Sequence, residues 1–222
     1  HALAPELILL TTFVVVLLGD VFTGEHQKWL TSSLTGIGFL AALVPLLTLA
    51  LDDGPPRALF GGAFVVDDFA LVMKAVFIVA GYVTVLLSTN YIAEGDYWQG
   101  EYYNLRVASV LGMVFMASAR DLISIFIALE MLSIPAYLLA GWRKRTLTGN
   151  EAGLKYYLMG TFASGVMLYG MSLIYGGTGT TLLAGIGEQI DGSFGDSPVA
   201  AVGIVFVLVA FGFKVSAVPF HN

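Results

Sequence analysis

Long apolar runs separated by short polar segments dominate the chain. Most of these runs hold about 20 residues, which is the length that an α-helix needs to cross the ~30 Å hydrocarbon core of a bilayer. They lack the alternation of apolar and polar positions that is typical of membrane-spanning strands. The pattern predicts helices over residues 3–22, 30–51, 69–91, 102–118, 122–142, 152–175 and 199–221, and no strand region. We therefore expect an all-α membrane protein, a transmembrane bundle with about seven spans.

The composition supports this prediction and excludes several kinds of site. Hydrophobic residues make up 57% of the 222 and charged residues only 12%, with a mean hydropathy of +0.84, whereas soluble domains carry about 25% charged residues. The net charge of −6 argues against a nucleic-acid partner. The chain has no cysteine and three scattered histidines, so thiolate metal sites and iron–sulfur clusters are excluded. No Gly-rich phosphate loop follows a strand. Any redox cofactor is therefore expected on another chain.

The lysine and arginine residues predict the orientation, because short cytoplasmic loops are enriched in them. Lys28 and residues 143–145 fall on one side of the predicted bundle, and Arg57 and Arg120 fall on the other. We expect the Arg143–Arg145 loop in the cytoplasm and the N-terminus outside. The chain begins with His1 and has no polar tail after its last apolar run, so we expect it to be part of a longer polypeptide.

Three ionisable residues, Glu130, Lys155 and Lys214, lie inside predicted spans. A charge at the bilayer centre costs roughly 2.5–3.5 kcal/mol on insertion scales, and such residues usually mark an ion or proton path. Glu130 is roughly 18 Å from the end of its span at residue 142, at 1.5 Å per residue. Pro135 removes a backbone donor five residues later and favours a bend beside the carboxylate. The alternative is a buried Glu130 that is hydrogen-bonded to a neighbouring helix, or protonated.

The two lysines differ in how easily their charge could reach water. Lys155 lies near the start of its span, where an ammonium can extend to the boundary, but apolar and aromatic residues flank it. Lys214 follows fifteen apolar or small residues and precedes Pro219 by five, which predicts a broken helix. Irregular backbone at membrane depth occurs where it is buried in protein or lines a wet cavity. The alternative for Lys214 is a lysine at the cytoplasmic end of its span.

The remaining charges need no such role. Lys74, Asp20, Glu6 and Arg106 lie near the ends of predicted spans, so we expect each to reach the boundary by extending its side chain. Gly160 and Ser164, four residues apart, are interpreted as small residues that let helices pack closely.

Three motifs, in order along the chain, resemble the antiporter-like subunits of respiratory complex I. Residues 127–137 have the sequence IALEMLSIPAY and look like the glutamate helix of that family. Residues 151–160 (EAGLKYYLMG) and 175–179 (YGGTG) most resemble subunit N within it. Residues 212–221 (GFKVSAVPFH) look like the broken helix that carries the family's lysine.

The resemblance implies a fold of about fourteen helices, in which a five-helix unit is followed by an inverted copy. Residues 1–100 would form three N-terminal transmembrane helices, and residues 101–222 most of the first five-helix unit. The function implied is proton translocation coupled to quinone reduction elsewhere in the complex. The membrane implied is the plasma or inner membrane of a bacterium. The implied partners are the other membrane subunits, including sibling antiporter-like subunits, together with lipids. NADH, FMN, iron–sulfur clusters and quinone would be bound by other subunits.

Within this family, each candidate residue has an expected role. Lys214 would be the central proton carrier, and Glu130 the carboxylate that tunes it, because burial disfavours a charged lysine and a nearby carboxylate favours it. Lys155 would relay protons or couple to a neighbouring subunit, and His221 would pass protons onward. Two alternatives remain: a subunit of a sodium/proton antiporter, which shares the glutamate and lysine motifs, and a membrane scaffold with inert buried ion pairs.

Overall fold

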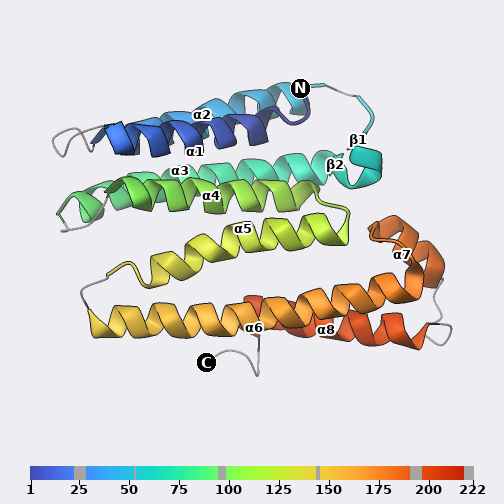
Figure 1. The fold of residues 1–222 in the computed structure, drawn as a ribbon. Helices are drawn as coiled ribbons and strands as arrows, with labels where there is room; N and C mark the ends of the chain where they lie inside the picture. The colour runs from blue at the N-terminus through green and yellow to red at the C-terminus, as the bar shows by residue number, and fades with distance from the viewer. Residues whose placement is uncertain (23–28, 53, 95–98, 144–145, 191–196, 218–222) are drawn as a thin grey trace.

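The computed structural model describes residues 1–22, 29–52, 54–94, 99–143, 146–190 and 197–217. Its helices stack in layers (Figure 1), with α1 and α2 in one layer, α3 and α4 in the next, then α5, then α6 and α8 together. The bounds of the helices are α1 Ala4–Phe22, α2 Trp29–Ala50, α3 Asp68–Glu94, α4 Gln99–Ser118, α5 Leu122–Ala140, α6 Leu147–Thr178, α7 Leu183–Ile190 and α8 Pro198–Lys214.

Five of the described helices, α1, α2, α3, α5 and α6, are long and apolar enough to cross a membrane. Helix α8 is apolar but has only 17 described residues, and α4 has polar residues in its first turns. The multi-span helical membrane fold is thus confirmed, while seven crossings and a fourteen-helix repeat stay predictions. Helix α6 has 32 residues, about 48 Å of helix, so it extends past the predicted range 152–175 at both ends.

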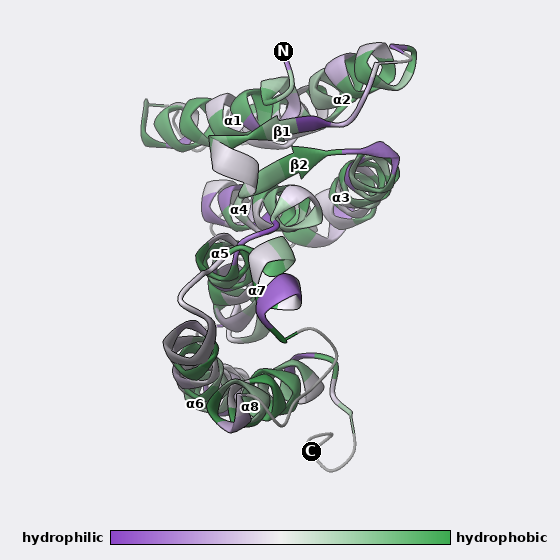
Figure 2. Cartoon of the chain, turned by 90° about the vertical axis from the view of Figure 1, so that its right-hand side faces the viewer, coloured by the Kyte–Doolittle hydropathy of each residue, from purple (hydrophilic) through white to green (hydrophobic). Residues whose placement is uncertain are grey.

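Hydrophobic residues make up most of the helices (Figure 2), and many of their side chains are exposed on the outside of the bundle. Exposed examples include Leu47, Leu87 and Phe162. A soluble domain rarely exposes apolar patches of this extent, so lipid contact is the physical explanation.

Polar side chains cap the starts of α5 and α6, and a glycine caps the end of α6. Asp121 caps α5 by accepting hydrogen bonds from the backbone N–H groups of Ile123 and Ser124, both at 3.0 Å, which pairs donors that have no partner within the helix. Thr146 caps α6 in the same way through Gly149. Helix α6 ends at Thr178 and is capped by Gly179, whose φ of +72° is the left-handed conformation that glycine adopts without strain.

The absence of strands was a wrong prediction. The connection between α2 and α3 forms an antiparallel hairpin, β1 (Arg57–Leu59) with β2 (Phe64–Val66), in which Leu59 pairs with Phe64. The short η2 segment (Phe60–Gly62) turns the chain, and Gly61 and Gly62 have φ values of +67° and +94° there. Short strands of this kind carry too few alternating positions to stand out beside the long apolar runs. The segment between the predicted helices at 152–175 and 199–221, where no helix was predicted, likewise contains the eight-residue helix α7.

The short α4–α5 connection joins two parts of the bundle. The backbone N–H of Arg120 donates to the Ala63 carbonyl at 2.8 Å, and its guanidinium donates to Asp67 at 2.9 Å. On its other side, the Arg120 carbonyl accepts from the Leu183 N–H at 3.0 Å. This segment therefore holds both the hairpin and the start of α7 against the same end of the bundle.

The described residues form three buried apolar clusters, of which the smallest packs the β2 strand against the N-terminus and two larger ones lie among the helices. One lies among α1 to α4 and includes Phe39, Ile78 and Val107. The other joins α5, α6, α7 and α8 and includes Leu129 and Met167. Helices α6 and α8 approach closely where two glycines face each other: a Cβ added at Gly203 would lie 2.6 Å from the Gly170 carbonyl oxygen. Small residues at such contacts are how membrane helices reach dense packing.

Candidate functional site: a buried lysine–glutamate pair

One face of α5 carries the polar side chains of the candidate site. Glu130, Ser133 and Tyr137 are separated by three and four residues, so successive helical turns bring them onto the same side. Ser133 and Tyr137 are almost completely buried. Ser133 donates to the Leu129 carbonyl at 2.6 Å, which leaves its hydroxyl oxygen able to accept another hydrogen bond.

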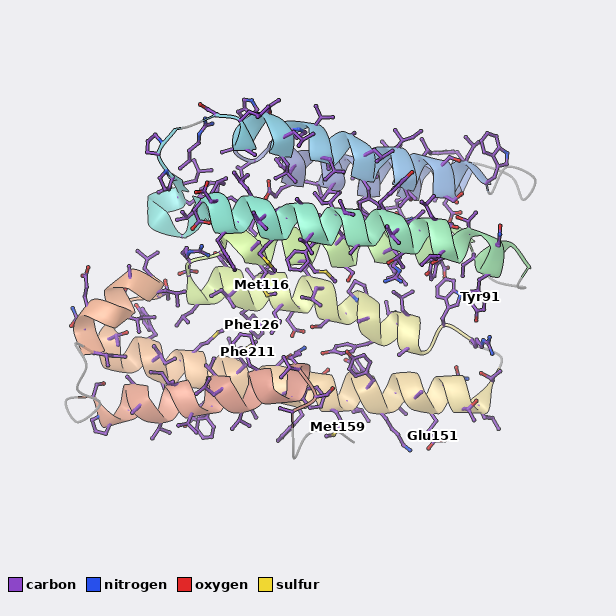
Figure 3. All side chains as sticks on the ribbon, turned by 180° about the vertical axis from the view of Figure 1, so that it is seen from behind. Tyr91, Met116, Phe126, Glu151, Met159 and Phe211 are labelled. Carbon is purple, nitrogen blue, oxygen red and sulfur yellow. The ribbon has the colours of Figure 1, made fainter. Side chains whose placement is uncertain are left out.

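Lys214, the last residue of α8, meets this face. Its Nζ donates to the Tyr137 hydroxyl at 2.6 Å and to Ser133 Oγ at 2.8 Å. Its distance to Glu130 Oε1 is 3.6 Å, an ion pair that is slightly too long for a direct hydrogen bond. The side chains of Lys214 and Glu130 are 11% and 22% exposed. Helix α8, whose last residue is Lys214, ends about halfway along α6 (Figures 1 and 3). The pair therefore lies far from both ends of α6.

The third helix of the site is α6, which supports the carboxylate. The Ser164 hydroxyl donates to Glu130 Oε1, and it also contacts the Gly160 carbonyl at 3.0 Å. Buried ion pairs are stable only when further hydrogen bonds satisfy the charged groups. Here Ser164 serves the carboxylate, and Ser133 and Tyr137 serve the ammonium.

Gly160 makes room for Tyr137. A Cβ at this position would collide with the Tyr137 hydroxyl and ring. The ring also packs edge-on against Tyr156, with ring centroids 4.7 Å apart, and it lies 5.2 Å from Lys214 Nζ. The small residue on α6 and the neighbouring aromatic ring therefore fix the position of the hydroxyl that binds Lys214.

The arrangement can hold a proton and pass it on. Lys214 Nζ has three donor positions when protonated and becomes an acceptor when neutral. Tyr137 and Ser133 are hydroxyls, which can accept from the ammonium or donate to the neutral amine. Glu130 lies close enough to stabilise the charged lysine, and an increase in their separation weakens that effect.

One of the predicted site residues, Lys155, is not part of this cluster. Lys155 is on an outward face of α6, with its side chain 73% exposed, and it forms an ion pair with Glu151 at 2.5 Å. Its place in the proton path therefore stays a prediction. His221 and Pro219 lie outside the described residues, as does the predicted break in the backbone at Pro219.

The prediction that Lys74 and Glu6 are boundary residues was wrong. Lys74 Nζ and Glu6 Oε1 are 2.7 Å apart, with side chains 0% and 5% exposed. The ammonium also lies 4.9 Å from the centre of the Phe64 ring. Distance from the end of a helix could not reveal this pair, because α1 and the hairpin cover Lys74 only in the folded chain.

The sequence pointed to Glu130 and Lys214 but not to their hydrogen-bond partners. Ser133 and Tyr137 could have been found from their helical spacing to Glu130. Ser164 could not, because its partner is on another helix. In the described part of the chain, no group of three or more His, Asp or Glu residues is arranged to hold a metal ion.

The chain is similar in sequence to known membrane proteins. Residues 119–222 match the family described as "NADH:quinone oxidoreductase/Mrp antiporter, TM". The chain is 40% identical to NADH-quinone oxidoreductase subunit N of Desulfovibrio desulfuricans over 228 aligned positions, which cover 99% of this chain and 44% of that protein. The chain thus spans less than half the length of such relatives.

Solved structures match over nearly the whole chain. One is a chain of respiratory complex I from Thermus thermophilus, with a TM-score of 0.77 and 33% identity, covering 98% of this chain and 45% of that one. Another is a chain of an archaeal membrane-bound sulfane sulfur reductase, with a TM-score of 0.83 and 22% identity, covering 99% of this chain and 45% of that one. The second likeness concerns the fold alone. The chain therefore resembles the NADH:quinone oxidoreductase/Mrp antiporter family over residues 119–222, and its similarity to subunit N extends over 99% of its length.

Proposed function

We propose that the chain is part of a proton-translocating membrane subunit of an NADH:quinone oxidoreductase. In this subunit Lys214 carries the proton, and Glu130 controls how tightly Lys214 holds it. The single observation that supports this most is the Lys214–Glu130 pair, held 3.6 Å apart by hydroxyl groups from α5 and α6. The redox reaction would take place elsewhere in the assembly. NADH, FMN, iron–sulfur clusters and quinone would all be bound there, and this chain would have a non-redox role.

In this mechanism the pair works as a switch. With Glu130 close and ionised, Lys214 keeps its proton. When the carboxylate moves away or is neutralised, the lysine releases the proton to the hydroxyl groups around it and to the groups that follow. His221 would be the next relay, because a histidine changes charge near physiological pH. Lys155, exposed on α6, would couple this subunit to its neighbour.

We propose the domain organisation, the partners and the membrane location on the same basis. Residues 1–100 would form an N-terminal three-helix part and residues 101–222 the first antiporter-like unit, with an inverted copy beyond it. Sibling antiporter-like subunits and lipids would be the partners. The subunit would lie in a bacterial cell membrane, with the N-terminus outside and the loop at 143–145 in the cytoplasm.

The test is proton pumping by the intact complex in sealed vesicles. Lys214→Arg keeps the positive charge but cannot release a proton at physiological pH, and Lys214→Ala removes the charge. We expect both variants, and Glu130→Gln, to lower the proton-to-electron ratio while the complex still assembles. Glu188→Gln is the matched control for Glu130→Gln, because Glu188 is exposed on α7. Unchanged ratios in all three variants would contradict the proposal.

A sodium/proton antiporter subunit is the second candidate, because the matched family includes Mrp antiporters. It requires transport that depends on sodium and not on NADH oxidation. Omitting sodium from the vesicle experiment distinguishes the two, since only the antiporter would stop.

A further inference from the structure

A second polar feature lies away from the lysine–glutamate pair. A cavity of about 690 Å³ opens where α3 and α4 face the junction between α5 and α6. Two arginines and three aromatic residues line it: Arg106, Arg143, Tyr91, Tyr102 and Trp142. Figure 3 shows Tyr91 reaching from α3 toward that junction.

The two arginines face aromatic hydroxyls in this cavity. Arg143 donates to the Tyr91 hydroxyl at 2.7 Å. Arg106 reaches the Tyr102 hydroxyl at 3.4 Å and lies 5.8 Å from the centre of its ring. Among the described residues, no carboxylate forms an ion pair with Arg106. Arg106 therefore offers positive charge to a ligand in the cavity.

Another part of the cavity wall is apolar. Ala136, Leu139 and Ala140 of α5 contribute this part of the lining. Trp142 and Tyr102 also line the cavity, with ring centroids 5.5 Å apart. Tryptophan and tyrosine gather where the headgroups of a membrane meet its hydrocarbon core. A ligand that fills this cavity must be anionic at one end and apolar at the other.

We propose that this cavity binds an anionic phospholipid, with its phosphate between Arg106 and Arg143 and an acyl chain along Ala136, Leu139 and Ala140. Basic pockets between transmembrane helices on the cytoplasmic side are suited to such headgroups. A free phosphate ion would use the arginines but gain nothing from the apolar wall. This inference does not depend on proton translocation, because none of its residues belongs to the Lys214 cluster.

The experiment labels the site in the purified, intact assembly. A phosphatidylglycerol that carries a photoactivatable group on its acyl chain is added, activated with light and located by mass spectrometry of the peptides. We expect the label within residues 136–142. Unlabelled phosphatidylglycerol should displace the probe at a lower concentration than phosphatidylcholine does, and inorganic phosphate should not displace it at comparable concentrations.

Variants show whether the arginines recognise the headgroup. Each lost cation near a membrane surface weakens binding about fivefold, so Arg106→Gln should raise the phosphatidylglycerol concentration needed for displacement by that factor. Arg106→Gln with Arg143→Gln should raise it roughly 25-fold. Arg57→Gln, which removes an exposed arginine on the hairpin, is the matched control and should change nothing.

Three results would each overturn the inference: labelling elsewhere, equal displacement by phosphatidylcholine, or variants equal to the control. Displacement by inorganic phosphate at the same concentration as the lipid would assign the site to a free anion instead. Electron transfer by the assembled variants, measured in parallel, separates a lost lipid site from a failure to fold.

Discussion

The buried pair between α1 and α3 allows a sharp test of stability. Glu6 and Lys74 are 2.7 Å apart and almost inaccessible to solvent. Glu6→Gln keeps the shape of the side chain but removes its charge, so the Lys74 ammonium remains buried without its counter-ion. The Lys74 ammonium still bears the cost of desolvation, while the attraction to Glu6 that offset this cost is lost.

The magnitude follows from the geometry. At 2.7 Å, and with an effective dielectric of ~20, the attraction between the two charges is about 6 kcal/mol. Relaxation and water entry reduce the net loss, and breaking one side of a buried pair typically costs about 3–5 kcal/mol. For a chain of this size, that corresponds to a melting temperature lower by on the order of 10 °C.

The assay is thermal unfolding of the purified full-length protein in detergent, followed by tryptophan fluorescence. Asp52→Asn is the matched control, because it makes the same change in the exposed pair between Asp52 and Arg57, where little stability is expected. The double variant Glu6→Gln with Lys74→Met should recover much of the loss, since it leaves no unpaired charge. If Glu6→Gln melts at the same temperature as Asp52→Asn, the reasoning about this pair is refuted.

Three further changes test other contacts. Tyr137→Phe keeps the ring but removes the hydroxyl that accepts from Lys214 at 2.6 Å; proton pumping by the intact complex should fall by roughly tenfold, and an unchanged rate would remove Tyr137 from the path. Lys155→Gln changes an exposed side chain, so the melting temperature should stay at the wild-type value while the proton-to-electron ratio falls; a loss of stability would instead indicate a structural role. Arg120→Gln removes the contact to Asp67 at 2.9 Å, so backbone hydrogen exchange in the β1–β2 hairpin should accelerate while exchange in α2 does not, and equal rates in the hairpin would show that other contacts hold it.

The sequence predicted the helices because their signal is local. A run of about 20 apolar residues needs no distant partner to be interpreted as a span, and the starts of α1, α2 and α3 fall within one residue of their predicted positions. The hairpin was missed because its strands have three residues each and pair with each other across a turn. The extension of α6 back to Leu147 was also missed, because its first turns are polar and carry no apolar pattern.

The candidate site was only partly visible in the sequence. Glu130 and Lys214 stood out because a charge within an apolar run needs an explanation wherever its partner lies. Lys74 was judged by its distance along the helix alone, and this measure ignores what other helices cover. The interpretation of Gly160 as a packing residue holds, but its particular neighbour, Tyr137, depends on how α5 and α6 meet.

By itself, then, the amino-acid sequence determined that this chain is a bundle of membrane helices with charges inside it. Hydrophobicity and the cost of a buried charge are properties of each segment alone. Tertiary structure decided which charges meet: Lys214 lies with Glu130 and its hydroxyl partners, Lys74 lies with Glu6, and Lys155 faces outward. Pairing energies fall steeply with distance, and distances between helices are set only when the helices pack together.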